Sequence, residues 1–117
     1  MQTYSERSGT NILICAPVRP VSKNLRRAIS EVICDIDAIV EAHLPDIITI
    51  ESGADATHVL FLVFEQRRQI QITMEAIDAA LANLSSNEER FDIWPITRSH
   101  ELLGTIREVN CIIGWRD

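Results

Sequence analysis

The sequence predicts an α+β protein, and two observations support this fold class. Strongly apolar runs of strand length alternate with segments of helical periodicity, in the order β-α-β-β-α-β followed by α-β. The seven residues Glu51 to Thr57 are too few for a crossover helix, so the strands on either side of them are expected to pair antiparallel. The first six elements therefore match a ferredoxin-like core with strand order 4-1-3-2, to which a C-terminal helix and strand are added. A flavodoxin-like parallel sheet that has lost one helix is the alternative.

The first strand is expected at Asn11–Val18, where successive apolar residues are typical of a strand covered on both faces. A long helix is predicted from the N-cap Ser22 to His43 or Leu44, and Pro45 ends it. The apolar residues of this segment recur with the 3.6-residue period of a helix. They are Leu25, Ile29, Val32, Ile33, Ile36, Ile39, Val40 and Leu44.

The remaining elements are, in order, strands at Asp46–Ser52 and His58–Glu65, a helix from Gln69 or Thr73 to Leu84, a strand at Phe91–Thr97, a helix capped by Ser99 and a strand at Cys111–Trp115. Pro95 places the fourth strand at a sheet edge. The third strand is apolar on both faces, so its second face must be covered by the last helix and strand or by a second copy of the chain. Of these, a homodimer is favoured.

Length, composition and charge restrict the class of protein. The chain has 117 residues, enough for one domain, which we expect at 11–117 after a flexible N-terminal arm at 1–10. The net charge of −6 argues against binding of duplex nucleic acid. The longest apolar run, Val59–Phe64, is too short to span a membrane, and the polar N-terminus lacks the apolar segment of a secretory signal. We therefore expect a soluble protein of the cytoplasm.

The residue types that carry catalysis or bind metals show no recognised spacing. Cys15, Cys34 and Cys111 are far apart and form no CxxC pair, as is usual for buried thiols in a reducing compartment. The motifs GxSxG, SxxK and HExxH do not occur, and the three histidines are expected at the ends of elements. No catalytic residue, metal site or cofactor is predicted. A non-enzymatic role is favoured, while the question of catalysis stays open.

Basic residues gather at the predicted starts of the first two helices. Because the first and third strands are parallel neighbours in the predicted sheet, these helix starts are expected at one end of the domain, where α/β sheets commonly bind ligands. Cations in the first turn also oppose the helix dipole, and a bound anion would relieve this. The candidate anion-binding residues are Arg19, Ser22, Lys23, Arg26, Arg27, Arg67 and Arg68.

Two further groups of residues are candidates for contact with another protein. Glu31, Asp35, Asp37 and Glu41 are expected to form an acidic face of the first helix. Trp94 and Trp115 are candidate interface residues, because tryptophan is enriched at the energetic centres of interfaces.

Two functions are consistent with these features. The first is a small acidic, non-enzymatic module that binds or regulates another protein, such as an inhibitor, an antitoxin or immunity-type protein, or a regulatory subunit; a basic partner surface would suit its charge. The second is a domain that binds a phosphate or nucleotide at the basic pole.

Overall fold

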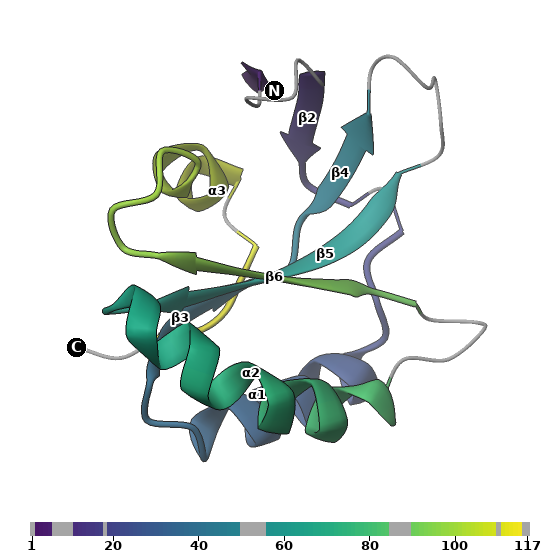
Figure 1. Cartoon of the computed structure of the whole chain (residues 1–117). Coiled ribbons are helices and arrows are strands. Elements are labelled where there is room, and N and C mark those ends of the chain that lie inside the picture. Colours follow the sequence, from purple (N-terminus) through teal and green to yellow (C-terminus); the bar gives the residue numbers. More distant parts are fainter. Residues whose placement is uncertain are drawn as a thin grey trace.

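The computed structural model describes residues 2–5, 11–17, 19–49, 56–84, 90–109 and 111–115. Within these ranges the chain forms a curled, mainly antiparallel sheet and three helices (Figure 1), so the α+β class is confirmed. The elements are β1 (Gln2–Ser5), β2 (Asn11–Cys15), α1 (Lys23–Cys34), β3 (Ile39–His43), β4 (Asp46–Thr49), β5 (Thr57–Phe64), α2 (Arg67–Ala82), β6 (Asp92–Thr97), α3 (Leu103–Val109) and β7 (Ile112–Trp115).

The strands β3 and β4 act as one long arm of the sheet, which we call the β3/β4 arm. Both strands pair antiparallel with β5, and the register does not change between them: Ala42 lies opposite Leu62, and Asp46 lies opposite His58. The carbonyl of Pro45 accepts a hydrogen bond of 3.0 Å from the N–H of Val59, so the pairing continues across the junction. The predicted antiparallel pairing around residues 51–57 is confirmed.

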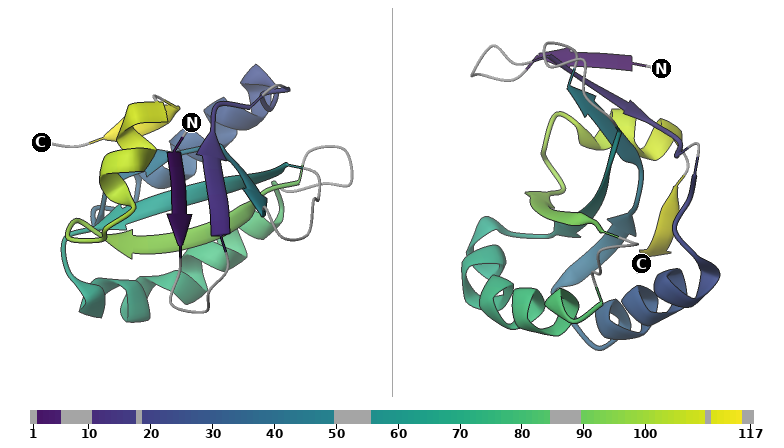
Figure 2. Two further views of the ribbon diagram at one scale, coloured as in Figure 1. Left: turned by 90° about the horizontal axis from the view of Figure 1, so that it is seen from above. Right: turned by 90° about the vertical axis from the view of Figure 1, so that its right-hand side faces the viewer.

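The other edge of the β3/β4 arm is divided between two strands. β2 pairs antiparallel with β4, and β7 pairs antiparallel with β3, so the sheet forks on this side. β1 lies outside β2, and β6 pairs in parallel with the opposite edge of β5. Figure 2 shows how the sheet curls from the β1 end towards the helices.

This strand order differs from the ferredoxin-like order 4-1-3-2, which is not confirmed. In that order the first predicted strand would lie beside the third, whereas β2 is separated from β5 by β4. The flavodoxin-like alternative also differs, because β5 and β6 are the one parallel pair among the described strands. Instead, β4, the part of the arm that follows Pro45, lies between β2 and β5 and pairs with both.

The two faces of β5 are covered within a single chain. Leu60, Leu62 and Phe64 pack on one face in a cluster with residues of α1 and α2. Val59, Phe61 and Val63 pack on the other face in a cluster that includes Leu102, Leu103 and Ile106, at and just before α3. The last helix therefore covers the second face, one of the two predicted solutions, whereas β7 lies at an edge of the sheet. Covering this face does not require a second copy, and the homodimer stays a prediction.

The predicted first helix is correct only in its first half. Ser22 is the N-cap, as predicted, and its hydroxyl oxygen accepts a 3.2 Å hydrogen bond from the N–H of Leu25. The helix ends at Cys34, however, and Ile39–His43 form β3. Aspartate is a poor helix former, and Asp35 and Asp37 follow Cys34 closely. The β-branched Ile39 and Val40 open β3, and Ile39 pairs with Phe64 of β5.

The later elements agree with the sequence more closely. α2 begins at Arg67, slightly before its predicted start, and α3 begins at Leu103, so Ser99 is not its cap. The strand β6, which contains Pro95, pairs with β5 alone among the described strands, as predicted for an edge. Gln2–Ser5 form β1, while residues 6–10 lie outside the described residues, so the flexibility of the arm stays a prediction. No helix in the described ranges is both long enough and apolar enough to cross a membrane.

Candidate functional site

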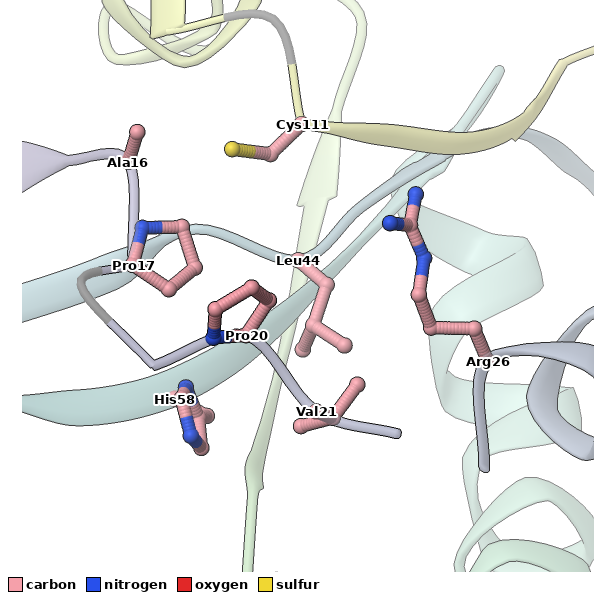
Figure 3. Close-up of a pocket in the computed structure, with 8 residues that line it drawn as sticks. All are labelled: Ala16, Pro17, Pro20, Val21, Arg26, Leu44, His58 and Cys111. Atoms are coloured by element: carbon pink, nitrogen blue, oxygen red, sulfur yellow. The ribbon is translucent and has the colours of Figure 1, made fainter. Parts of the chain in front are cut away.

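A pocket opens where β2 and β7 diverge from the β3/β4 arm. Its volume is about 240 Å³. The side chains that line it come from the connection between β2 and α1, the first turn of α1, the junction of the arm, β5 and the start of β7 (Figure 3). They are Ala16, Pro17, Pro20, Val21, Arg26, Leu44, His58 and Cys111.

A row of polar side chains crosses the sheet beside this pocket. Cys15, Asp46 and His58 are direct cross-strand partners on β2, β4 and β5, and partners in this relation project to the same face. Asp46 is 5% exposed and accepts a short hydrogen bond at its Oδ1 from Nδ1 of His58. Because a carboxylate can only accept, this contact places the proton of neutral His58 on Nδ1 and leaves Nε2 as an acceptor.

The thiols near the pocket are held in the protonated form. Burial raises the pKa of Cys15 above its ordinary value, and the charge of Asp46 raises it further. Burial also raises the pKa of Cys111, against the opposing effect of the nearby Arg26 guanidinium. Since the thiolate is the nucleophile, neither cysteine is arranged as an activated catalytic residue.

Charge is distributed unevenly around the pocket. Arg26 lines one side and forms no ion pair with a carboxylate in the described part of the chain. His58 lines another side, and none of the lining residues is acidic, although the whole chain carries a net charge of −6. The apolar side chains of Val21 and Leu44 lie between these two polar groups (Figure 3).

The structure does not bring the two predicted basic clusters together. Arg26 is beside Leu44 and His58, whereas α2 starts beyond Phe64, six residues further along β5, which corresponds to about 20 Å of strand. The two helices also run in opposite directions (Figures 1 and 2). The single basic pole was therefore wrong, because it depended on the predicted strand order. The cluster at α1 comprises Arg19, Ser22, Lys23, Arg26 and Arg27, and the one at α2 comprises Arg67 and Arg68.

The predicted acidic face is also divided. Glu31, Asp35 and Asp37 are exposed, on α1 or just after it. Glu41 is 5% exposed and lies in β3, so its assignment to an exposed helix face was wrong. The error follows directly from extending the first helix through β3.

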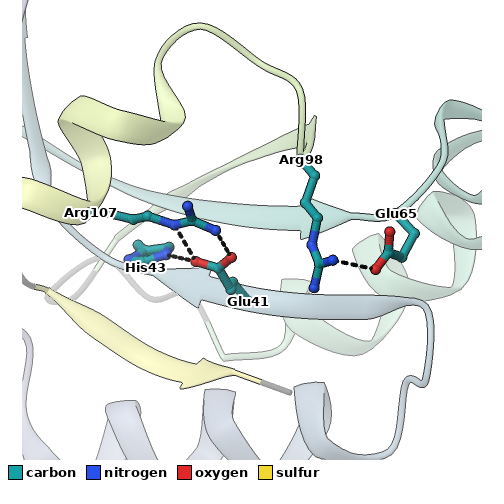
Figure 4. Close-up of polar contacts among 5 residues, drawn as sticks. All are labelled: Glu41, His43, Glu65, Arg98 and Arg107. Carbon is teal, nitrogen blue, oxygen red and sulfur yellow. Dashed lines mark hydrogen bonds and ion pairs between the residues drawn. The ribbon is translucent and has the colours of Figure 1, made fainter. Parts of the chain in front are cut away.

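Glu41 instead belongs to a buried polar cluster on the α3 side of the sheet (Figure 4). Its two oxygens accept hydrogen bonds from Arg107 of α3, the one from Nε being 3.0 Å long. Nε2 of His43 lies 3.0 Å from the same carboxylate and donates to it. The other ring nitrogen of His43, Nδ1, is buried without a hydrogen-bond partner among the described residues.

The pKa values in this cluster follow from burial and pairing. The hydrogen bond from Arg107 lowers the pKa of Glu41, and this effect exceeds the opposing effect of burial. Burial lowers the pKa of His43, and the neighbouring Glu41 offsets this only in part. At neutral pH the cluster therefore holds an ionised Glu41, a neutral His43 and a charged Arg107, an arrangement that ties α3 to β3.

The two tryptophans differ in what the structure describes. Trp94 is half-buried in β6 and stacks on Phe61 of β5, with ring centroids 5.2 Å apart and an interplanar angle of 28°. Part of the Trp94 ring is therefore packed against the hydrophobic core. Trp115 ends β7, but its side chain lies outside the described residues. Contact of either residue with a partner stays a prediction.

Sequence reasoning identified Arg26 but missed His58 and Asp46 as site residues. The sequence did predict that the two strands carrying these residues pair antiparallel. It did not predict the register of this pairing, which makes Asp46 and His58 direct partners. Across the described ranges, no group of three or more His, Cys, Asp or Glu side chains is placed to hold a metal ion. No protein-family model, curated protein or solved structure matches the chain.

Proposed function

We propose that the protein binds a small anionic molecule in the pocket at the fork of the sheet. One observation carries this proposal: in an acidic chain, the pocket is lined by Arg26 and by no carboxylate, and the buried Asp46 beside it is hydrogen-bonded to His58. An arginine without a carboxylate partner is a strong donor for a carboxylate or phosphate group, because its planar N–H groups match two anionic oxygens.

The size of the pocket defines the ligand further. Its volume of about 240 Å³ is below the range of about 300–1,000 Å³ that drug-sized ligands occupy. A small carboxylate or phosphate ester suits this space better than a nucleotide. The anionic group would contact Arg26, the apolar part would pack on Val21 and Leu44, and Nε2 of His58 would accept a hydrogen bond from a ligand hydroxyl or amine.

Binding is favoured over catalysis. The Asp46–His58 pair has the form of a base that is oriented by a carboxylate, yet neither neighbouring thiol is activated as a nucleophile. The protein-binding function expected from the sequence rested partly on an apolar face that α3 covers, and it stays a prediction.

The test is a binding screen with a matched set of arginine variants. Calorimetry or NMR titration would compare inorganic phosphate, small carboxylates and small phosphate esters with their neutral analogues. Arg26→Gln is expected to weaken binding of the anionic compounds about tenfold to a hundredfold, because a hydrogen bond to a charged group contributes about 1.5–3 kcal/mol. Arg27→Gln is the control, since Arg27 is the adjacent residue, is exposed and does not line the pocket. Equal binding by the two variants would place the anion elsewhere and defeat the proposal.

A further inference from the structure

The fork of the sheet brings together two cysteines that are far apart in the sequence. Cys15 ends β2 and lies opposite Asp46 of the β3/β4 arm. Cys111 immediately precedes β7, and its carbonyl accepts a 2.9 Å hydrogen bond from the N–H of Leu44 on the same arm. β2 and β7 flank the same edge of the arm, so the two cysteines face positions only two residues apart.

This placement is compatible with a disulfide bond. Leu44 and Asp46, the positions that the two cysteines face, are two residues apart on one strand, a span of about 6.6 Å. Disulfides usually join Cα atoms that are about 4.4–6.8 Å apart. The side chains of Leu44 and Asp46, two positions apart on one strand, project to the same face, and their cross-strand partners share that face. The two thiols are therefore expected on the same face of the sheet.

Two further observations agree with this placement. In Figure 3 the sulfur of Cys111 points towards Ala16, the residue that follows Cys15. The charge of Cys15 also affects the pKa of Cys111, as expected for thiols that lie near one another. Cys15 and Cys111 are both partly buried, and all three cysteines of the chain are unbridged in the structure.

We propose that Cys15 and Cys111 form a reversible disulfide across the fork, beside the pocket. The oxidant is a low-molecular-weight disulfide. The thiolate of one cysteine attacks a sulfur of this molecule, which releases one of its halves as a thiol and leaves a mixed disulfide. The second cysteine, as thiolate, then attacks the protein sulfur of the mixed disulfide and releases the other half as a thiol. Two protein thiols are thereby oxidised, one small disulfide is reduced to two thiols, and two protons pass from the protein thiols to the released thiols.

The bond would connect the two strands that the sheet itself leaves separate. β2 and β7 each pair with the arm, and among the described pairings they do not pair with each other. A covalent bond between the end of β2 and the residue before β7 would close the segment from residue 15 to residue 111 into a loop. This segment is most of the chain. Such a loop restricts the unfolded chain strongly, so the oxidised form is expected to unfold at a higher urea concentration.

Cys34 is an internal control for this chemistry. It is exposed at the end of α1, whereas the pocket lies at the start of that helix, and 12 residues of helix span about 18 Å. A Cys15–Cys111 bond is therefore expected to form without a large change of the native fold. A bond from either of these residues to Cys34 would require the fold to rearrange.

The experiment uses the full chain in buffers of reduced and oxidised glutathione, followed by alkylation and mass spectrometry of the intact protein and its peptides. The expected result is an intramolecular bond between Cys15 and Cys111, with Cys34 alkylated. A bond to Cys34, a stable glutathione adduct at Cys15 or Cys111, or three alkylated thiols at every buffer ratio would overturn the proposal. Oxidation in concentrated urea gives the reference mixture of the three pairings of an unfolded chain.

Variants separate this pairing from a general loss of structure. Cys34→Ser is expected to form the bond at the same buffer ratio as the unchanged chain. Cys15→Ser is expected to prevent it. Should Cys15→Ser fold poorly, the peptide analysis of the Cys34→Ser variant decides the question, since only one intramolecular bond is then available. Absence of that bond under oxidising conditions would refute the pairing without affecting the proposed ligand site, which is tested separately through Arg26.

Discussion

Arg107 of α3 holds the carboxylate of Glu41 in β3, although 66 residues separate them in the chain. Glu41 is almost fully buried, whereas the side chain of Arg107 is 52% exposed. The pair therefore connects the helix that covers one face of the sheet to the strand beneath it. The hydrogen bond from Arg107 also lowers the pKa of Glu41, against the opposing effect of burial.

Replacing Arg107 by Gln should destabilise the protein by about 2 kcal/mol, since it leaves a buried carboxylate without its charged partner. Urea unfolding would measure this change. Arg98→Gln is the matched control, because Arg98 contacts Glu65 at 2.8 Å with both side chains about half exposed. Such a pair contributes at most about 1 kcal/mol. Equal losses for the two variants would contradict the role of burial at Glu41.

Titration of His43 should weaken the fold at mildly acidic pH. Burial holds the pKa of His43 below its ordinary value of 6.5, so the unfolded chain takes up a proton at a higher pH than the folded chain. The contribution of His43 is therefore complete above about pH 6.5 and is lost as the pH falls towards its lowered pKa. Glu41 and Arg107 are the charged groups that affect it.

The comparison that isolates this effect is between the unchanged chain and His43→Gln, unfolded in urea at pH 7.5 and at pH 5.5. Glutamine can donate to Glu41 but does not titrate in this range. The difference in stability between the two pH values should be smaller for the variant. An identical pH dependence would assign the acid sensitivity to other groups.

Two isoleucines of α2 should respond very differently to the same change. Ile77 is 0% exposed and packs in the cluster beneath the sheet, so Ile77→Ala should cost about 2–4 kcal/mol. Ile72 is 71% exposed on the same helix, and Ile72→Ala should change stability by about 0.5 kcal/mol or less. Thermal or urea unfolding of both variants checks the orientation of α2. A large cost at Ile72 would mean that this face is covered in solution.

Alkylation should distinguish the three thiols by their surroundings. Cys34 is exposed and should react first with iodoacetamide. Cys15 and Cys111 should react more slowly at neutral pH and accelerate as the pH approaches and passes 9, because burial raises their pKa values and the thiolate is the reactive form. Mass spectrometry of a time course gives the order. Faster reaction at Cys15 than at Cys34 would contradict the partial burial of Cys15.

The sequence predicts most elements of this fold because their patterns are local. Ser22 as the cap of α1, the antiparallel hairpin around residues 51–57 and the edge position of Pro95 all follow from a few neighbouring residues. The error at Ile39–His43 has a physical cause. The apolar residues there continue the helical period of α1, yet the same residues also satisfy a strand that is buried on both faces, and pairing with β5 decides between the two.

The candidate site is less accessible to such reasoning, because it depends on register and on strand order. Arg26 was identified as a cation at a helix start, but the start of α2, which carries its expected companions Arg67 and Arg68, follows the far end of β5. The residue that lines the pocket together with Arg26 is His58 of β5, which is hydrogen-bonded to Asp46 of the neighbouring strand β4. A shift of the hairpin by one residue would separate this pair, and the residue pattern alone does not fix that register.

The constant register of the β3/β4 arm with β5 from Glu41 onward has a consequence for the order of folding. A hairpin closes over a short stretch of chain, so its contacts form at a low entropic cost. β2 and β7 come from opposite ends of the sequence, and each docks on its own half of the arm. The hairpin is thus expected to act as the folding nucleus, a template on which the two ends of the polypeptide assemble independently and last.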